Sequence, residues 1–253
     1  MKVATIIRAR MSSTRLPGKV LKNIPNSDLT MIELMVNRAR KSMLSDEVIV
    51  ATTTEPTDDP LCDRLKNKNI NFYRGSEENV LRRVLNTAKS NNVDIIVEVT
   101  GDCPILDHTI IDQSIGFFLK QKTEYVGNTC ISNAYPRGMD VKVFSTKTLE
   151  KVNSLTQNPD DLEHVSLFIY NNRDIFQCTP LPAPKFKVHP KTRLTVDYLE
   201  DLELVLKIIE AKGVDCSFEQ IVKLLESNPE LMQINGNLNV SYINDNTRNQ
   251  KYR

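Results

Sequence analysis

Residues 8–19 read Arg-Ala-Arg-Met-Ser-Ser-Thr-Arg-Leu-Pro-Gly-Lys and directly follow an apolar run at residues 3–7. The apolar run predicts a buried strand, and Pro17-Gly18 predicts a turn near the end of the loop. In an α/β sheet, ligands bind beyond the carboxyl ends of the strands. The loop that follows this first strand is therefore the first place to expect a binding site.

This loop has a local excess of positive charge. Ser12, Ser13 and Thr14 add hydroxyl donors, and no acidic residue precedes Asp28. Arginine side chains donate paired hydrogen bonds to phosphate oxygens, and free backbone amides add further donors. The pattern predicts a polyphosphate-binding loop, and a solvated basic loop is the alternative. The basic residues of this region are Arg8, Arg10, Arg15, Lys19 and Lys22.

The composition is that of a balanced globular protein. Of the 253 residues, 40% are hydrophobic and 26% are charged, which allows a sizeable core. The net charge is only +1, so we expect no nucleic-acid partner, which would need a broad basic face. No apolar stretch is long enough to span a membrane or to form a signal-peptide core. We therefore expect no membrane partner and a cytoplasmic location.

The cysteines and histidines lie far apart in the sequence. There is no Cys-x-x-Cys pair, so a structural zinc site is not expected. An odd number of scattered cysteines is typical of reduced thiols in a cytosolic protein. The cysteines are Cys62, Cys103, Cys130, Cys178 and Cys216, and the histidines are His108, His164 and His189.

Strands and helices alternate in the first half of the chain. Strands are predicted at residues 3–7, 48–51, 70–73 and 95–99, with helices at residues 31–43, from residue 59, and at residues 80–88. Thr30 and Glu33 form a capping box, and Ser76 is expected to cap the helix at residues 80–88. This alternation predicts an α/β fold with a mostly parallel, Rossmann-like sheet and helices on both faces.

The topology predicts where the loops meet. Right-handed crossovers between parallel strands place the carboxyl ends of those strands along one edge. The loop at residues 8–19 and the turns at residues 74–76 and 100–104 should therefore share one crevice.

The second half is less regular. Strands are predicted at residues 125–126, 140–144 and 194–196, and helices at residues 161–170, 198–212 and from Ser217 to before Pro229. From Gln233 onward the chain is rich in Asn and poor in apolar residues. This segment is either a loosely attached tail or a segment that a partner orders. We predict one domain at residues 1–232 and a polar tail at residues 233–253.

Two aspartates directly follow strand-like runs. Magnesium takes one or two protein carboxylates and fills its other positions with phosphate oxygens and water, and Asp102 and Asp197 fit this role. The alternatives are that Asp102 only hydrogen-bonds its own turn and that Asp197 caps the next helix. Glu200 and Asp201 stand in the first turn of that helix, where acids favour the helix dipole, and are predicted to be structural.

Several segments, in order along residues 3–205, resemble those of a known family. The segments are Arg-Ala-Arg-x-x-Ser-Thr-Arg-Leu-Pro-x-Lys at residues 8–19, Arg-Gly-Ser-Glu-Glu-Asn-Val-Leu-x-Arg at 74–83, Thr-Gly-Asp-Cys-Pro at 100–104, Gly-Met-Asp-Val at 138–141, Asp-x-Glu-His-Val at 161–165 and Arg-Leu-Thr-Val-Asp-x-x-x-Asp-Leu at 193–202. They resemble the cytidylyltransferases that make CMP-activated sugar acids. The resemblance is closer to the spore-coat polysaccharide biosynthesis protein F branch.

The resemblance implies a nucleotidyltransferase that moves CMP from CTP to a sugar acid or related sugar-type acceptor and releases pyrophosphate, for surface polysaccharide or glycan biosynthesis. It implies a homodimer and Mg²⁺ on Asp102 and Asp197. The implied catalytic residues are Arg15, Lys19, Asp102 and Asp197. The expected nucleotide-binding residues are Arg8, Ala9, Arg10, Ser12, Ser13, Arg15, Lys19, Arg74, Ser76 and Thr100, and the expected acceptor-binding residues are Asp140, Glu163 and His164.

Some alternatives stay open. Leu162 and Lys142 stand where the branch has Arg and Glu, and both lie in the half expected to hold the acceptor. His164 either contacts the acceptor or is a buried, paired histidine, and Ser76 either reads the nucleotide or only caps a helix. A product linked to CDP, made from a sugar or polyol phosphate, is an alternative reaction.

Other classes of nucleotide-binding protein fit less well. A dinucleotide oxidoreductase or an ATPase is excluded by the absence of Gly-x-Gly-x-x-Gly and of a Walker loop. A metal-dependent glycosyltransferase of similar architecture remains an alternative, although the sequence has no Asp-x-Asp.

Overall fold

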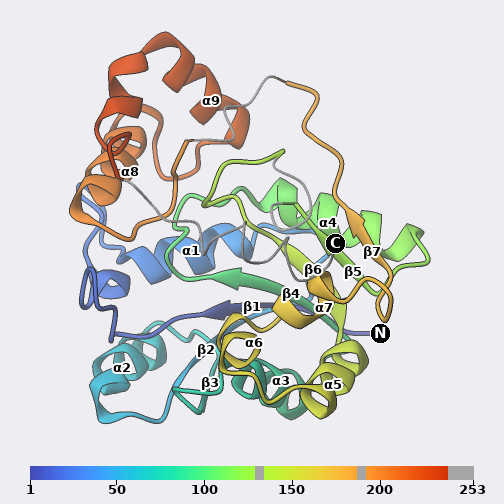
Figure 1. The fold of residues 1–253 in the computed structure, drawn as a ribbon. Helices are drawn as coiled ribbons and strands as arrows, with labels where there is room; N and C mark the ends of the chain where they lie inside the picture. Colours follow the sequence, from blue (N-terminus) through green and yellow to red (C-terminus); the bar gives the residue numbers. More distant parts are fainter. Residues whose placement is uncertain (129–133, 187–191, 239–253) are drawn as a thin grey trace.

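The computed structural model describes residues 1–128, 134–186 and 192–238. Within these residues, the centre of the fold is a seven-stranded sheet with the order β3-β2-β1-β4-β6-β5-β7 (Figure 1). The strands are β1 (Val3–Arg8), β2 (Glu47–Thr53), β3 (Phe72–Gly75), β4 (Ile95–Thr100), β5 (Tyr125–Gly127), β6 (Lys142–Ser145) and β7 (Cys178–Pro180).

The sheet is mostly parallel, as predicted. Strand β1 pairs in parallel with β2 and β4, β2 with β3, and β5 with β7. Only β6 runs antiparallel, between β4 and β5. Because β1 to β4 are parallel, their carboxyl ends lie along one edge, while β6 begins at that same edge.

Helices cover both faces because the central strands are apolar on both sides. In β1, Ala4 and Ile6 pack into one core, and Val3 and Ile7 pack into the other. The first core is covered by α3 (Val80–Ser90), α5 (Thr146–Leu155) and α7 (Leu167–Asn171). The other face carries α1 (Met31–Ala39), α2 (Asp59–Asn67), α4 (His108–Lys120), α8 (Leu199–Lys212) and α9 (Phe218–Ser227).

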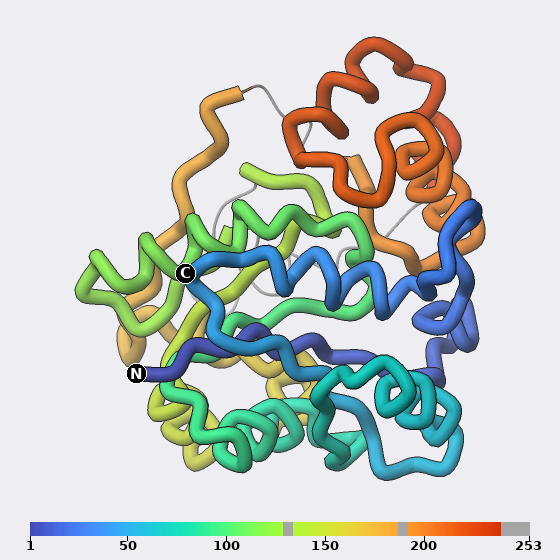
Figure 2. The backbone as a smooth tube through the Cα atoms, turned by 180° about the vertical axis from the view of Figure 1, so that it is seen from behind, coloured from blue at the N-terminus to red at the C-terminus, as the bar shows by residue number. Residues whose placement is uncertain are grey.

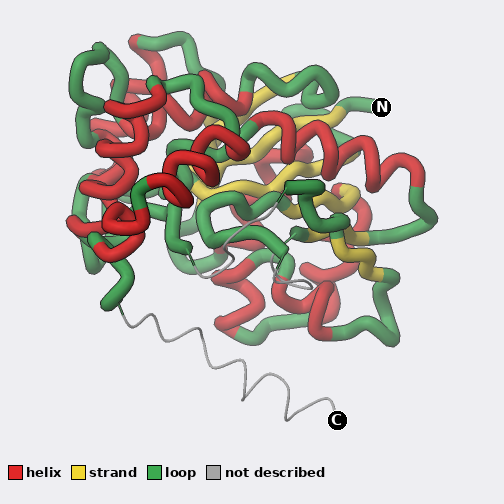
Figure 3. The backbone as a smooth tube through the Cα atoms, turned by 90° about the horizontal axis from the view of Figure 1, so that it is seen from above, coloured by secondary structure: helices red, strands yellow, loops and turns green. Residues whose placement is uncertain are grey.

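Seen from behind, α1 and α4 run side by side across this second face (Figure 2). From above, the strands run beneath these helices (Figure 3). Helices α8 and α9 lie together at the end of the sheet where β1 and β4 finish (Figure 1). The remaining short elements are η1 (Lys19–Leu21), η2 (Pro56–Asp58), α6 (Pro159–His164) and η3 (Pro229–Gln233).

Local capping chemistry explains most helix starts. The predicted capping box of α1 is present, with the Thr30 amide donating to Glu33 at 2.7 Å. The predicted cap at Ser76 is wrong, because Asn79 caps α3 and its side chain accepts from the Arg82 amide. Ser76 instead accepts from the Asn79 amide and so shapes the turn before the helix.

The structure after β4 differs from the prediction in several elements. The single helix predicted at residues 161–170 is two helices, α6 and α7, because Val165 has a φ of 53° and turns its side chain into the core. The strand predicted at residues 194–196 is absent from the described residues, where a single bridge joins Arg137 and Arg193. The prediction also missed α4, α5 and β7. Strand β6 starts at Lys142, two residues after the predicted start.

The packed chain continues past the predicted boundary at residue 232. Asn235 is 3% exposed, and Ile234 packs against the core beside η3. Residues 239–253, which make up most of the predicted tail, lie outside the described residues, as do Cys130 and His189. Among the described residues, no helix combines the length and the apolar character needed to cross a membrane.

We expect Gly138→Ala to destabilise the protein by about 3 kcal/mol or more. Gly138 has a φ of 103°, and an added Cβ would lie 2.6 Å from the Leu194 carbonyl oxygen. Gly213 is the matched control, since its φ is 81° but nothing lies within 4 Å of an added Cβ. Gly213→Ala should cost the backbone strain alone, about 1–3 kcal/mol, and so less than Gly138→Ala. Urea unfolding of both variants measures the difference, and equal losses would contradict the close packing at Gly138.

Candidate functional site

The loops at the carboxyl ends of β1, β3 and β4 open onto one cavity of about 1030 Å³. This is the crevice that the sequence predicts. The antiparallel strand β6 begins at this edge, so the residues just before it and at its start also line the cavity. The cavity therefore has one side built from the ends of parallel strands and another built from β6 and α6.

Most predicted site residues come together here. Those that line the cavity are Arg8, Ala9, Arg10, Ser13, Arg15, Lys19, Ser76, Thr100, Asp102, Asp140, Glu163, His164 and Asp197. Leu162 and Lys142, the two departures from the family pattern, line it as well. His164 is half-buried at the end of α6.

Two predicted nucleotide-binding residues lie elsewhere. Ser12 donates its hydroxyl hydrogen bond to Glu77 at 2.7 Å. The Arg74 guanidinium donates hydrogen bonds to the carbonyl oxygens of Thr53 and Glu55. It also forms an ion pair with Asp59. Neither side chain lines the cavity, and Arg74 instead ties β3 to the loop after β2.

Lys19 joins the two predicted metal ligands. Its ammonium lies 3.1 Å from Asp102 Oδ2 and 3.1 Å from Asp197 Oδ1, and it also donates to the Val196 carbonyl at 2.7 Å. Gly18, with a φ of 68°, turns the chain so that Lys19 points inward. Burial alone would lower the pKa of Lys19, but the two carboxylates raise it above its ordinary value. Two aspartates 95 residues apart thus meet at one cation.

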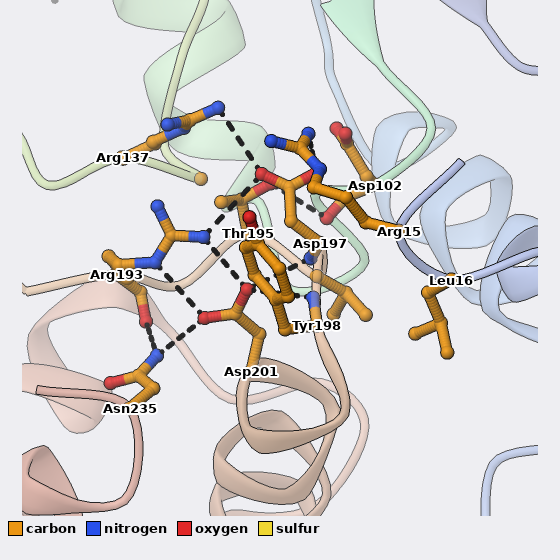
Figure 4. A network of polar contacts seen from close by, with 12 residues as sticks. Arg15, Leu16, Asp102, Arg137, Arg193, Thr195, Asp197, Tyr198, Asp201 and Asn235 are labelled. Carbon is orange, nitrogen blue, oxygen red and sulfur yellow. Dashed lines mark hydrogen bonds and ion pairs between the residues drawn. The ribbon is translucent and has the colours of Figure 1, made fainter. Parts of the chain in front are cut away.

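Asp197 is surrounded by cations (Figure 4). It is 1% exposed. Arg15 Nη2 lies 2.7 Å from Asp197 Oδ1, while Nη2 of Arg137 and Nη2 of Arg193 lie 3.2 and 3.5 Å from Oδ2. The Arg15 guanidinium also stacks over the Tyr198 ring, 5.4 Å from its centre. The buried negative charge is therefore compensated on both of its oxygens.

Sequence reasoning missed Arg137, although it directly precedes the quoted segment at residues 138–141. Its turn is fixed from two sides: Asp140 Oδ2 accepts from the Gly138 amide at 2.7 Å, and the Leu194 amide donates to the Arg137 carbonyl at 2.7 Å. Asp140, predicted to bind the acceptor, thus also stabilises the turn that carries Arg137.

A second buried carboxylate, that of Glu98, pairs with two cations that line the cavity. Glu98 on β4 is 1% exposed, and its Oε1 is 3.0 Å from Arg8 Nη2 and 3.4 Å from Lys142 Nζ. Burial would raise the pKa of Glu98, but Lys142 and Arg8 hold it below its ordinary value. Arg8 Nη1 also donates to the Glu163 carbonyl at 3.2 Å, which links β1 to α6. The sequence signal for Glu98 was a charged residue inside an apolar strand.

Arg83 is a further buried cation that sequence reasoning did not assign. It is 3% exposed and lines the cavity, and its Nη1 donates to the Ser76 carbonyl. Burial, together with the nearby charges of Arg8 and Arg10, lowers the pKa of Arg83 to about 10. Arg83 thus holds the turn after β3 and adds positive potential to this wall.

Asp102 and Asp197 are the candidate protein ligands for a magnesium ion in this cavity. No group of three or more His, Cys, Asp or Glu side chains that could hold a metal occurs among residues 1–128, 134–186 and 192–238. A cage made only of protein ligands is therefore not present in that part of the chain. Asp102 and Asp197 nevertheless converge on one positive charge, and two carboxylates are the usual protein share of a magnesium site that borrows phosphate oxygens. The residues fit such an ion.

Comparisons with known proteins agree with this geometry. Residues 4–244 match the model of a family described as cytidylyltransferase. The spore coat polysaccharide biosynthesis protein SpsF of Bacillus subtilis is 33% identical over 89% of this chain and 94% of its own length. A cytidylyltransferase structure from Leptospira borgpetersenii is 34% identical with a TM-score of 0.85, covering 92% of this chain and 97% of that one.

A more distant structure shares the fold alone. It is the CMP:2-keto-3-deoxy-manno-octonic acid synthetase complexed with CTP, which is 17% identical with a TM-score of 0.63. The aligned region covers 83% of this chain and 99% of the synthetase.

We expect the free energy of unfolding to fall in acid as the Asp102 carboxylate becomes protonated. Burial alone would raise the pKa of Asp102, but Lys19 and a hydrogen bond from Thr100 hold it at about 2. The unfolded value is about 3.9, so the ionised carboxylate contributes stability above that pH and loses it as the pH falls toward 2. The contribution is about 1–2 kcal/mol after allowance for partial exposure. Urea unfolding of Asp102→Asn between about pH 5 and pH 2.5 should therefore give a shallower acid loss than the parent.

Asp63→Asn, at an exposed position on α2, is the control for this pH dependence. It should follow the parent across the same range. If Asp102→Asn loses stability with acid as steeply as the parent, the Lys19–Asp102 pair does not contribute to folding.

Proposed function

The chain belongs to the cytidylyltransferase family, and from this premise we propose that it transfers CMP from CTP to a sugar acid or a related sugar-type acceptor, with release of pyrophosphate. The observation that carries the proposal is the meeting of Lys19 with Asp102 and Asp197 beside the basic loop. Cations that ion pairs with carboxylates already hold in one cavity are well placed to bind a triphosphate.

The reaction requires mostly positioning and charge neutralisation. A hydroxyl oxygen of the acceptor attacks the α-phosphorus of CTP, the bond from that phosphorus to the bridging oxygen breaks, the hydroxyl proton is released, and pyrophosphate leaves. Arg15 and Lys19 would donate to the phosphate oxygens and neutralise the charge that develops on the leaving group. A magnesium ion held by Asp102 and Asp197 would supply further neutralisation of the phosphate charge when it is bound.

The other side of the cavity suits the acceptor. Asp140, Lys142, Glu163 and His164 line it and come from β6, the turn before it and α6. Hydroxyl groups of a sugar can pair with the carboxylates, and an anionic group can pair with Lys142 or His164. The 33% identity to the spore coat polysaccharide biosynthesis protein SpsF supports a role in surface polysaccharide or glycan biosynthesis. The homodimer and the cytoplasmic location stay predictions from the sequence.

One observation favours a second acceptor class. Lys142 and Arg8 share the single carboxylate of Glu98, so Glu98 balances only one of these two positive charges. That excess suits a phosphate as well as a carboxylate. A sugar or polyol phosphate that attacks through its phosphate oxygen would give a CDP-linked product.

A screen of pyrophosphate release tests both candidates. We expect turnover with CTP and with at least one sugar acid or sugar phosphate, and little turnover with UTP, ATP or GTP. Sugar acids and sugar phosphates are assayed in separate sets, with the reaction product identified by mass. Equal turnover with ATP, or calorimetric binding of ATP as tight as that of CTP, would overturn the assignment of the nucleotide.

We expect Arg15→Ala and Lys19→Ala each to weaken CTP binding by roughly ten- to a hundredfold. Each loses charge-assisted phosphate hydrogen bonds worth about 1.5–3 kcal/mol. Arg74→Ala is the matched control, because Arg74 is bonded outside the cavity. It should bind CTP like the parent in the same titration calorimetry. If Arg74→Ala weakens binding as much as Arg15→Ala, the phosphate site is not the one that lies beside Asp197.

A further inference from the structure

Asp201 supports the backbone that carries Asp197. It stands in the first turn of α8 and is fully buried. Its Oδ2 accepts from the amide of Asp197 at 3.0 Å and from the amide of Tyr198 at 3.1 Å. These amides precede the first helical hydrogen bond and would otherwise lack a partner in the helix. Asp201 therefore fixes the position from which the Asp197 side chain leaves the chain.

Arg193 links the two aspartates. Its Nε donates to Asp201 Oδ1 at 3.1 Å and its Nη2 to Asp201 Oδ2 at 2.8 Å, while the same Nη2 is 3.5 Å from Asp197 Oδ2. The paired geometry makes Asp201 the main partner of Arg193. Burial would raise the pKa of Asp201, but the hydrogen bonds from Arg193 keep it low. Arg193 is thus held mainly by Asp201 and makes only a longer contact with Asp197. The closer cations of Asp197 are Arg15, Lys19 and Arg137.

Asn235 holds this pair from a distant part of the chain. It follows η3, lies 34 residues after Asp201, and is 3% exposed. Its side-chain amide donates to Asp201 Oδ1 at 2.8 Å and to the Arg193 carbonyl at 3.0 Å. Figure 4 shows Asn235 on the far side of Asp201 from Asp197, with dashed lines from Arg193 to both carboxylates. One amide group therefore restrains both residues that position Asp197.

We propose that Asn235 is a positioning residue of the site: acting through Asp201 and Arg193, it aims the Asp197 carboxylate at Lys19 and Arg15. The inference rests on the proposed function of Asp197. The bond to Asp201 also attaches the segment after η3 to the first turn of α8. Both partners of the asparagine side-chain amide, Asp201 and Arg193, are however residues that contact Asp197. The segment after η3 thus completes the site without entering the cavity.

Removing the Asn235 side chain would take one hydrogen-bond donor from the buried carboxylate of Asp201. Without the Asn235 donor, Asp201 Oδ1 keeps only Arg193 in a buried position, and the carboxylate can rotate. Rotation of the Asp201 carboxylate weakens its two hydrogen bonds from Arg193. The Arg193 guanidinium can then move closer to Asp197 Oδ2, which is 3.5 Å away in the parent, and compete there with Arg137.

Within the described residues, Asn235 makes no hydrogen bond to the loop at residues 8–19, and Lys19 keeps its bonds to Asp102 and to the Val196 carbonyl. The effect should therefore appear in kcat and in the response to magnesium, with little change in KM for CTP.

The test uses Asn235→Ala with Asn228→Ala as its matched control. Asn228 lies just before η3, and its side-chain amide donates to the Leu224 carbonyl at 2.9 Å. Both variants lose an asparagine side chain in the same region, so similar small drops in melting temperature are expected. Only Asn235→Ala should lower kcat, by about tenfold, since losing a hydrogen bond to a charged group is worth about 1.4 kcal/mol or more. KM for CTP should stay within about twofold of the parent.

Two readouts do not depend on turnover. Calorimetry of CTP with and without Mg²⁺ should give parent-like binding without the metal and a smaller gain in affinity on adding the metal for Asn235→Ala only. A crystal structure of Asn235→Ala should have the Asp197 carboxylate displaced from Lys19.

Failure of the inference and failure of the proposed function are distinguishable. If Asn235→Ala matches Asn228→Ala in kcat and in its magnesium response while the parent is active, the inference is overturned and the proposed function stands. If the parent neither binds nor turns over CTP, the proposed function fails. The crystal structure then decides: a displaced Asp197 supports the positioning role, and an unmoved Asp197 overturns it.

Discussion

A buried carboxylate surrounded by four cations is the interaction on which this fold depends. Taking the charge of Asp197 out of water costs several kcal/mol unless paired groups compensate it. The compensation comes from Arg15 and Lys19 in the first loop, from Arg137 before β6 and from Arg193 in the segment before α8. These segments are far apart in the sequence, so satisfying one buried charge fixes the relative positions of the loops that form the cavity.

The same principle recurs at the other side of the site. Glu98 is buried on β4 and is shared by Arg8 and Lys142. In both clusters the cations outnumber the buried carboxylate that holds them. Such an arrangement keeps arginine and lysine side chains ordered and aimed into the cavity before a ligand arrives, which reduces the ordering cost of binding an anion. The carboxylates therefore serve binding indirectly, by preparing their cationic partners.

Sequence reasoning succeeded where the signal is local. Apolar runs and helical spacing predicted the parallel half of the sheet. Asp102 and Asp197 converge on Lys19 as expected, although Asp197 follows no strand in the described part of the chain. It failed where a partner is distant: Arg74 faces the loop after β2, and the network of Asn235 joins residues more than thirty positions apart. The helix break at Val165 was not predicted for a related reason. Its positive φ places the side chain in the core, and this backbone conformation leaves no periodic pattern in the sequence.

The direction of β6 explains why the two sides of the cavity differ in predictability. Parallel strands end at the site, and each is followed at once by a loop whose composition can be read directly, as in residues 8–19. Strand β6 runs the other way, so the site meets its beginning, at Lys142, and the irregular turn before it. That turn is shaped by contacts with the segment at residues 193–196, which no local pattern encodes. The departures at Lys142 and Leu162 fall on this side, and Lys142 shares Glu98 with Arg8, so a change at residue 142 also alters the charge balance at the end of β1.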